Sequence, residues 1–243
     1  MRAPLPETAG PHGTAGTAVV FLAGVYEDEA YYRGWAVGAA VVVAADGGAR
    51  FLVAAGVRPD VVVGDFDSLS PAAAARLAAD GVELLRHPVR KDVTDGELAV
   101  EEALRRGAGE LVLVGALGAL DHTLGHLAIL RRLAARGVAA RLAAPQLTVR
   151  VFVAPARTVL DAGAGTRVSV AALGGDALLT LRGFDYPLTR GVLPADACLG
   201  LGNSVAAGSA ADIVFHEGAA AVLVESGDEA FGGARRVAGS GRR

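Results

Sequence analysis

The chain has 243 residues, a hydrophobic fraction of 52% and a formal net charge of -3. This length and apolar content are typical of a folded chain with one large domain or two modest ones, and they exclude an intrinsically disordered protein. The small net charge gives no electrostatic reason to expect nucleic acid or an anionic membrane as a partner.

The cysteine content and the apolar runs indicate in which cellular compartment the protein is expected. Cys198 is the only cysteine, which excludes an internal disulfide and fits a cytoplasmic protein. Residues 1–16 lack the apolar core of a signal peptide and are predicted to be a flexible tail. The longest apolar run, residues 35–45, is too short to span a bilayer. We therefore expect a soluble protein.

Residues 17–148 alternate apolar runs with helical patterns. The runs are apolar throughout, which is typical of strands covered on both faces, and the alternation predicts a mostly parallel, Rossmann-like α/β domain. Strands are expected at residues 18–22, 41–45, 61–63, 83–85, 111–114 and 139–143, and helices at 71–79, 94–106 and 124–136.

The pattern changes near residue 145, after which no convincing helical segment occurs. Short β-prone segments separated by Gly and Pro follow, which predicts a small β-sandwich over residues 149–231. The expected strands are 147–153, 167–172, 177–181, 213–216 and 220–225. The Gly- and Arg-rich residues 232–243 are predicted to be a second flexible tail.

Acidic residues follow the predicted strands of the first domain. Asp46 follows the second strand, and Asp65 and Asp67 follow the third in the stretch VVVGDFDSL. Asp121 comes a short loop after the fifth strand, and Asp92 and Asp95 stand at the start of a helix. In an open parallel sheet, ligands bind at the carboxyl ends of the strands. We therefore expect these carboxylates to converge on one edge.

Convergent carboxylates repel one another unless a cation lies among them. Mg²⁺ fits best, because it takes oxygen ligands and bridges to substrate phosphates. The predicted helix start at Thr94 adds free backbone amides that suit a phosphate, and Lys91, the only lysine in the chain, adds positive charge. Together these features predict metal-assisted phosphoryl chemistry.

Each motif also has a purely structural interpretation. Asp46-Gly47-Gly48 is typical of a turn, Asp-x-Asp occurs in surface turns, and Thr94 with Glu97 forms a capping box whatever else it does. His122 could simply bond to a backbone carbonyl. The sequence contains no Walker phosphate loop, no G-x-G-x-x-G after a strand and no G-x-S-x-G elbow, which removes the main competing signatures.

Four motifs occur in the order found in thiamine pyrophosphokinases. They are ADGGA at 45–49, GDFDS at 64–68, KDVTDGELAV at 91–100 and LDHTLGHL at 120–127. GFDYPL at 183–188 and GLGNS at 200–204 lie where that family has two further segments of its C-terminal β-sandwich, although Gly202 and Ser204 flank Asn203 where serine and glutamate are expected. Over residues 19–226 the chain therefore resembles the thiamine pyrophosphokinase family.

The resemblance implies Mg²⁺-dependent transfer of the pyrophosphoryl group of ATP to the hydroxyl of thiamine, giving thiamine diphosphate and AMP. It also implies a homodimer in which each active site lies between the α/β domain of one subunit and the sandwich of the other. The implied metal-binding and catalytic residues are Asp65, Asp67 and Asp95; the nucleotide-binding residues are Asp46, Gly47, Gly48, Ser68, Lys91, Asp92 and Thr94; the thiamine-binding residues are Asp121, His122, Tyr186, Asn203 and Ser204.

The acceptor side departs from the family pattern. Residues 118–122 lack the arginine that the family has in this segment, and Arg50, Arg86 and Arg90 are possible substitutes for it. His126 occupies a position where the family frequently has an asparagine. Two alternatives therefore stay open: an enzyme that acts on a different hydroxymethyl heterocycle, and a non-catalytic nucleotide- or thiamine-binding protein.

Overall fold

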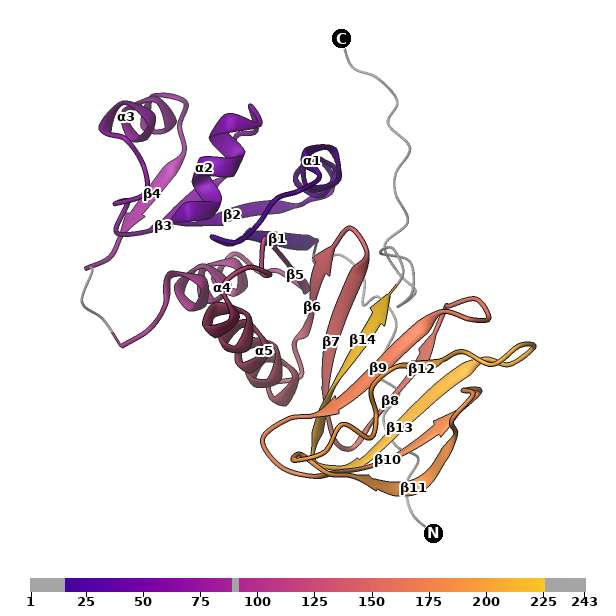
Figure 1. Ribbon diagram of the computed structural model, residues 1–243. Coiled ribbons are helices and arrows are strands. Elements are labelled where there is room, and N and C mark those ends of the chain that lie inside the picture. The colour runs from indigo at the N-terminus through magenta and orange to yellow at the C-terminus, as the bar shows by residue number, and fades with distance from the viewer. Residues whose placement is uncertain (1–15, 89–91, 226–243) are drawn as a thin grey trace.

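The computed structural model describes residues 16–88 and 92–225. Within these residues five helices and fourteen strands are formed (Figure 1). The helices are α1 (Glu29–Gly38), α2 (Gly47–Ala54), α3 (Pro71–Ala79), α4 (Asp95–Arg105) and α5 (Leu120–Ala135). The strands are β1 (Thr17–Phe21), β2 (Val41–Ala45), β3 (Val61–Gly64), β4 (Glu83–Arg86), β5 (Glu110–Val114), β6 (Ala139–Ala144), β7 (Leu147–Val153), β8 (Ala156–Leu160), β9 (Arg167–Ala172), β10 (Ala177–Arg182), β11 (Leu188–Leu193), β12 (Asn203–Ser204), β13 (Ala211–Glu217) and β14 (Ala219–Glu225).

A single ten-stranded sheet runs through the described chain in the order β12-β9-β14-β7-β6-β5-β1-β2-β3-β4. The six strands from β6 to β4 are parallel to one another. From β7 onward the neighbours are antiparallel, and β7 joins β6 through the pair Leu142 and Val149. The parallel part and the antiparallel part therefore share one hydrogen-bonded sheet.

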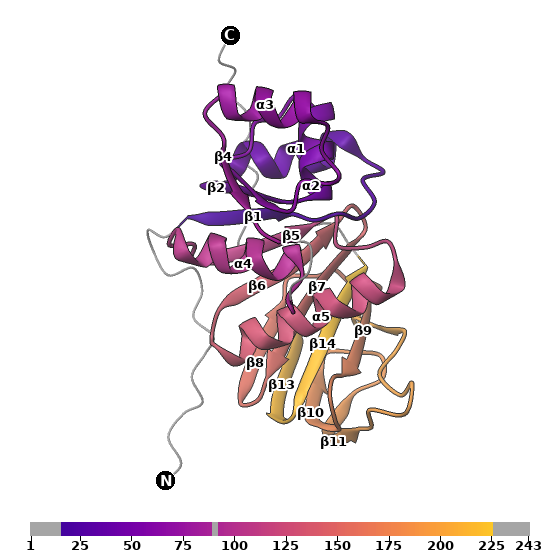
Figure 2. The same cartoon turned by 90° about the vertical axis from the view of Figure 1, so that its left-hand side faces the viewer.

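Helices cover both faces of the parallel part (Figures 1 and 2). One face packs against α1, α2 and α3 through residues such as Phe21, Tyr32 and Leu52. The other face packs against α4 and α5 through residues such as Val100 and Leu130. Because both faces are covered, the central strands β1, β2, β3 and β5 are apolar except at the first residues of β1 and β5, Thr17 and Glu110, as the sequence pattern predicts.

The antiparallel part packs against a second sheet of four strands in the order β11-β10-β13-β8. Phe152 of β7 and Val222 of β14 lie in the core between the two sheets, together with Leu179 and Phe215 of the second sheet. This confirms the predicted fold class: an N-terminal α/β part followed by a C-terminal β part.

All eleven predicted strands form, several with identical bounds, and so do the three predicted helices. Two helices, α1 and α2, and three strands, β8, β11 and β12, were not predicted. The predicted helix at 124–136 begins one turn earlier, at Leu120, which moves Asp121 and His122 from a loop into the helix. The domain boundary predicted between residues 148 and 149 falls inside β7.

None of the helices in the described ranges is long and apolar enough to cross a bilayer. The prediction for Lys91 and most of the two predicted tails fall outside the residues that the structure describes.

Candidate active site at the carboxyl edge of the sheet

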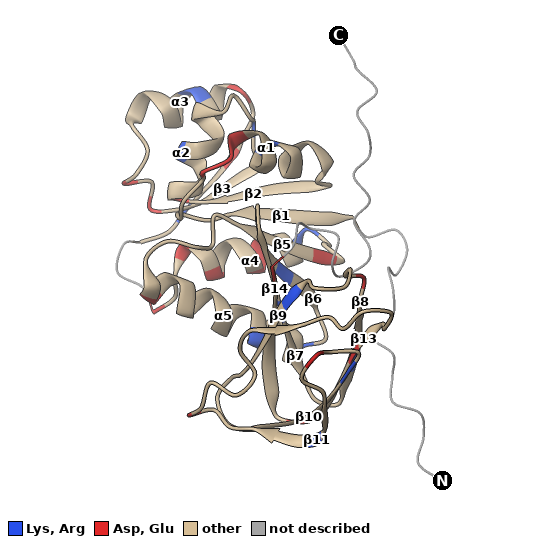
Figure 3. Cartoon of the chain, turned by 45° about the vertical axis from the view of Figure 1, so that its right-hand side comes forward, with Lys and Arg blue, Asp and Glu red and all other residues tan. Residues whose placement is uncertain are grey.

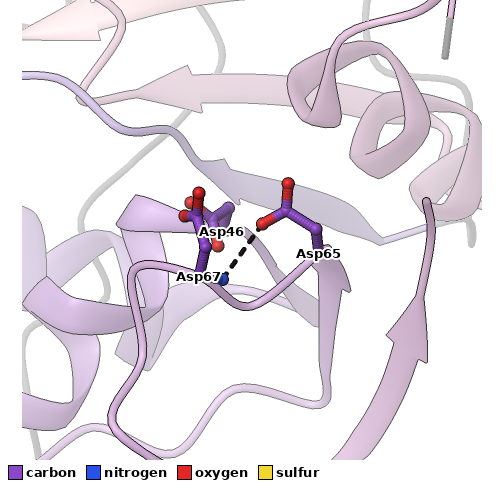
Figure 4. A group of neighbouring side chains, drawn as sticks. All are labelled: Asp46, Asp65 and Asp67. Atoms are coloured by element: carbon purple, nitrogen blue, oxygen red, sulfur yellow. Dashed lines mark hydrogen bonds between the residues drawn. The ribbon is translucent and has the colours of Figure 1, made fainter. Parts of the chain in front are cut away.

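Three aspartates meet where β2 and β3 end. Asp46 follows β2, and Asp65 and Asp67 follow β3, which is the neighbouring strand. A carboxylate oxygen from each lies within 4.8 Å of the other two (Figure 4). The sequence prediction that acids converge at this edge is thus confirmed for these three.

The first strand determines the geometry around Asp46. A Cβ atom on Gly48 would lie 2.1 Å from the carbonyl oxygen of Phe21, and one on Gly47 would lie 2.7 Å from the Cβ of Ala23. Only glycines allow α2 to begin this close to the end of β1. Asp46 precedes them with φ 33° and ψ -98°, a strained conformation for a residue with a side chain.

The loop after β3 is also strained and is held from β4. Gly64 has φ 151° and Phe66 has φ 66°. The Asp65 carboxylate accepts a hydrogen bond from the Asp67 backbone N–H at 3.0 Å. The Arg86 guanidinium donates to the Asp65 carbonyl oxygen at 2.8 Å and lies 4.8 Å from the centre of the Phe66 ring. Arg86 therefore fixes the loop through its backbone and leaves the carboxylates without a direct ion pair from this arginine.

The environment of Asp46 disfavours its negative charge. Burial raises the pKa of Asp46, the Ser68 side chain opposes this effect, and the charges of Asp67, Asp65 and Asp95 add to it. Ser68 Oγ nevertheless lies outside hydrogen-bond geometry: neither it nor Asp46 Oδ1 has a partner among the described residues, although both atoms are buried. A buried carboxylate oxygen without a donor is costly unless a cation meets it.

The start of α4 brings a fourth aspartate to this edge. Asp95 is the first residue of α4, and its Oδ1 lies 3.2 Å from the position that a Cβ on Gly64 would occupy. The capping box forms as predicted: Thr94 Oγ1 accepts from the Glu97 N–H at 3.2 Å, and Glu97 accepts from the Thr94 N–H at 3.0 Å. That bond from Thr94 contributes most to lowering the pKa of Glu97. Asp92, by contrast, is exposed.

Asp121 and His122 lie in the first turn of α5 and are exposed. Asp121 accepts a hydrogen bond from the His122 backbone N–H at 2.8 Å. One turn further along, His126 is buried, and its Nδ1 lies 2.7 Å from the carbonyl oxygen of Ala116. Because a carbonyl only accepts, Nδ1 carries the proton. Burial lowers the pKa of His126, which keeps the ring neutral near pH 7.

The predicted sandwich residues lie far from the acidic edge within one chain. Asn203 and Ser204 form β12, the last strand of the large sheet, and seven strands separate β12 from β3, a span of roughly 40 Å at the usual strand spacing. Asn203 is buried and bonds to both backbone groups of Tyr186, at 3.0 and 2.8 Å. The Tyr186 side chain itself is 74% exposed. Asn203 thus holds Tyr186 in place, a role that the sequence did not indicate.

The acidic edge fits a divalent cation. Its donors are all carboxylate oxygens, the kind of ligand that Mg²⁺ prefers. The buried Asp46 Oδ1 without a hydrogen-bond partner and the pKa of Asp46, raised by burial and by its acidic neighbours, are both features that a bound cation would relieve.

Comparisons with known proteins agree with the fold and the motifs. Residues 34–142 match the family model for the catalytic domain of thiamin pyrophosphokinase. The curated thiamine pyrophosphokinase of Bacillus subtilis (strain 168) is 28% identical over 166 residues, which cover 67% of this chain and 77% of that protein. Among solved structures, a thiamin pyrophosphokinase from Geobacillus thermodenitrificans has a TM-score of 0.71 at 25% identity, covering 88% of this chain and 99% of that chain.

More distant structures show the same fold. The yeast thiamin pyrophosphokinase has a TM-score of 0.71 at 13% identity and covers 90% of this chain and 88% of its own. The α/β part with an acidic edge and the C-terminal β part, taken with these relatives, indicate a transferase. The chain is thus similar to thiamine pyrophosphokinases in the sequence of residues 34–142 and in its fold.

Proposed function

We propose that the protein transfers the pyrophosphoryl group of ATP to the hydroxyl of thiamine, giving thiamine diphosphate and AMP, in a reaction that requires Mg²⁺. The observation that carries this proposal is the meeting of Asp46, Asp65 and Asp67 within 4.8 Å at the ends of β2 and β3. The similarity to thiamine pyrophosphokinases supports thiamine as the acceptor, and the converging carboxylates support a phosphate donor such as ATP that is bound with Mg²⁺.

In this proposal Asp65, Asp67 and Asp95 bind the metal, and Asp46 supports it from the buried side. A bound Mg²⁺ neutralises phosphate charge and orients the group that is transferred. The residues of the chain supply the other contacts that bind and orient the substrate. The amino-terminal end of α4, whose helix dipole favours negative charge, would face the phosphates, and the Arg86 contact keeps the loop of Asp65 and Asp67 in one conformation.

The acceptor would lie between two subunits. Tyr186 is bonded to Asn203 of β12, at one end of the large sheet, whereas the acidic edge lies near the other end, so one chain cannot present both to one thiamine molecule. A homodimer in which the β part of one subunit faces the acidic edge of the other solves this problem, and it places the exposed Tyr186 ring against the heterocycle. Asp121 and His122, exposed at the start of α5, complete the acceptor side in this arrangement.

Two alternatives follow from the departures on that acceptor side. The enzyme could act on another hydroxymethyl heterocycle, since residues 118–122 lack an arginine. A non-catalytic binder is disfavoured, because simple binding of a nucleotide or of thiamine does not need three converging carboxylates.

The decisive experiment incubates the purified protein with ATP, Mg²⁺ and thiamine and separates the products by chromatography. We expect AMP and thiamine diphosphate in equal amounts, and neither product after addition of EDTA. If ATP binds but thiamine stays unmodified while another hydroxymethyl heterocycle is converted, the acceptor assignment is wrong. If no acceptor is converted, the catalytic proposal is wrong.

A further inference from the structure

Two arginines connect α5 to α4, the helix that begins with Asp95. Arg132 of α5 donates through Nη1 to Glu97 Oε1 at 2.7 Å. Arg136, the residue after α5, donates through Nη1 to Glu101 Oε1 at 2.5 Å. Figure 3 shows acidic segments on α4 and a basic segment toward the end of α5. The two helices are thus joined by a pair of similar charged contacts.

The two contacts determine how the helices lie against each other. The second pair follows the first by four residues on both helices, which is about one turn. The helices therefore run in the same direction where they touch, side by side on one face of the sheet (Figures 1 and 2). Their amino-terminal ends point the same way, so the contacts set where α4 begins along α5.

Only the first pair includes the carboxylate that caps α4. Glu97 Oε2 accepts the Thr94 N–H at 3.0 Å and the Thr94 hydroxyl at 3.2 Å, while Oε1 accepts from Arg132. The pKa of Glu97 is lowered mainly by the bond from the Thr94 backbone, and the bond from Arg132 adds to this effect. Glu101 lies one turn further along α4 and takes no part in the capping box. One carboxylate thus joins the start of α4 to α5.

Arg132 matters for the cap because it restricts the Glu97 side chain. An unrestrained glutamate samples many conformations, and holding it in one of them is unfavourable. Glu97 is also the more shielded of the two carboxylates, with 23% of its side chain exposed against 48% for Glu101, so its ion pair is less weakened by solvent. Without Arg132, the carboxylate loses the contact that holds it against the Thr94 N–H, and the first turn of α4 with Asp95 is less well fixed.

We propose that Arg132 is a positioning residue for the acidic edge, which acts through Glu97 and Thr94 to fix Asp95 at the start of α4. This inference rests on the proposed function, because it takes Asp95 as a metal-binding residue. Arg136 makes the same kind of contact between the same two helices without touching the cap, and it therefore offers a matched control.

The test measures binding of Mg²⁺ with α,β-methylene ATP, in which the bond broken in the proposed reaction is replaced, by isothermal titration calorimetry without an acceptor. We expect about fivefold weaker binding in Arg132→Gln, as for a weakened helix cap, and a change of about twofold or less in Arg136→Gln. Arg132→Lys keeps a cation beside Glu97 and should recover most of the affinity. Melting temperatures should fall by similar amounts in both glutamine variants, so stability alone would not explain the difference.

A double-mutant cycle tests whether Arg132 acts through Glu97. In a Glu97→Ala background the capping carboxylate is already lost, so Arg132→Gln should cause no further loss of affinity for the analogue. Losses that add up in the double variant would show that Arg132 acts by another route.

The inference and the proposed function fail in different ways. Equal affinities of Arg132→Gln and Arg136→Gln for the analogue, or additive losses in the cycle, overturn the inference even if the wild type converts thiamine. An affinity that depends on Arg132 in a protein that does not convert thiamine supports the inference and overturns the acceptor assignment alone. If the wild type does not bind the analogue with Mg²⁺, both are wrong.

Discussion

At the scale of single residues, Asp46 combines burial, backbone strain and like charges in one place. Its φ of 33°, its buried Oδ1 without a partner among the described residues and its three acidic neighbours all oppose the folded state at neutral pH. Such conflicts are tolerated where a ligand relieves them. The features of Asp46 that reduce the stability of the folded chain are therefore the same ones that favour binding of a cation.

Asp46→Asn should stabilise the metal-free protein at pH 7. Because the pKa of Asp46 is raised above its usual value of 3.8, the folded chain keeps this proton to a higher pH than the unfolded chain. Stability is thus lost as the pH rises through the raised pKa. We expect the variant to melt about 2–4 °C higher than wild type, the shift that 1 kcal/mol gives in a chain of this size.

Thermal denaturation followed by circular dichroism measures this effect in EDTA at pH 7 and at pH 3. The difference should vanish at pH 3, where the carboxyl is protonated in both states. Mg²⁺ should raise the melting temperature of the wild type more than that of the variant. A variant that melts below wild type at pH 7 would show that the Asp46 charge does not oppose folding.

Asp67→Asn tests the acidic edge at the level of catalysis. Asp67 is the exposed member of the three-carboxylate group, so the substitution should leave the fold intact. We expect the rate of AMP and thiamine diphosphate formation to fall by about 100-fold or more, because a metal-binding oxygen is lost. Asp80→Asn, at the exposed end of α3, serves as the control. Metal-dependent turnover that survives in Asp67→Asn would remove this residue from the metal site.

At the scale of elements, the sequence predicts strands better than it predicts the helices near the site. The central strands are apolar almost throughout, so their pattern is strong. In α1, Gly34 and four aromatic or β-branched residues weaken the helical signal. The start of α2 carries two glycines that are typical of a turn. The structure shows that they are required by close packing against Phe21, a contact that no local pattern reveals.

Part of the candidate site was predictable because it depends on where the strands end. Asp46, Asp65, Asp67 and Asp95 follow strands or begin a helix, so the topology of a parallel sheet brings them together. The roles of Arg86 and Asn203 depend on contacts across 21 and 17 residues of sequence, and those distances are set only by the packed fold.

The capping box of α4 offers a test that separates stability from binding. Thr94→Ala removes the hydrogen bond that the Glu97 N–H donates to Thr94 Oγ1 and should cost about 1 kcal/mol of unfolding free energy. Ser70→Ala is a matched control, because Ser70 caps α3 through a 3.2 Å bond to the Ala73 N–H. Urea denaturation should show similar losses for both variants.

Thr94→Ala should also raise the KM for ATP more than Ser70→Ala does, because α4 begins with Asp95, whose charge acts on Asp46, whereas the first turn of α3 has no acidic residue. An equal KM for the two variants would mean that the start of α4 does not contact the nucleotide.

At the scale of the whole molecule, the separation of Tyr186 from the acidic edge makes the proposed homodimer testable by mixing. Asp67→Asn and Tyr186→Ala chains should each be nearly inactive. When they are unfolded, mixed in equal amounts and refolded, half of the dimers contain one chain of each kind. One of the two sites in such a dimer is intact, so about a quarter of wild-type activity should return.

Each variant refolded alone is the control for this experiment and should stay inactive. Activity that does not return, in a mixture shown by mass spectrometry to contain mixed dimers, would place both residues in one subunit's site or exclude Tyr186 from it.

The continuous large sheet has a consequence for how the two parts of the chain move and unfold. Since β7 and β14 extend the same hydrogen-bonded sheet that carries the acidic edge, there is no interdomain hinge between the α/β part and the β part. Closure around a substrate must then come from loops or from the second subunit. Amide exchange in β6 and β7 should be slowest of all, because opening either half separates strands that both halves share.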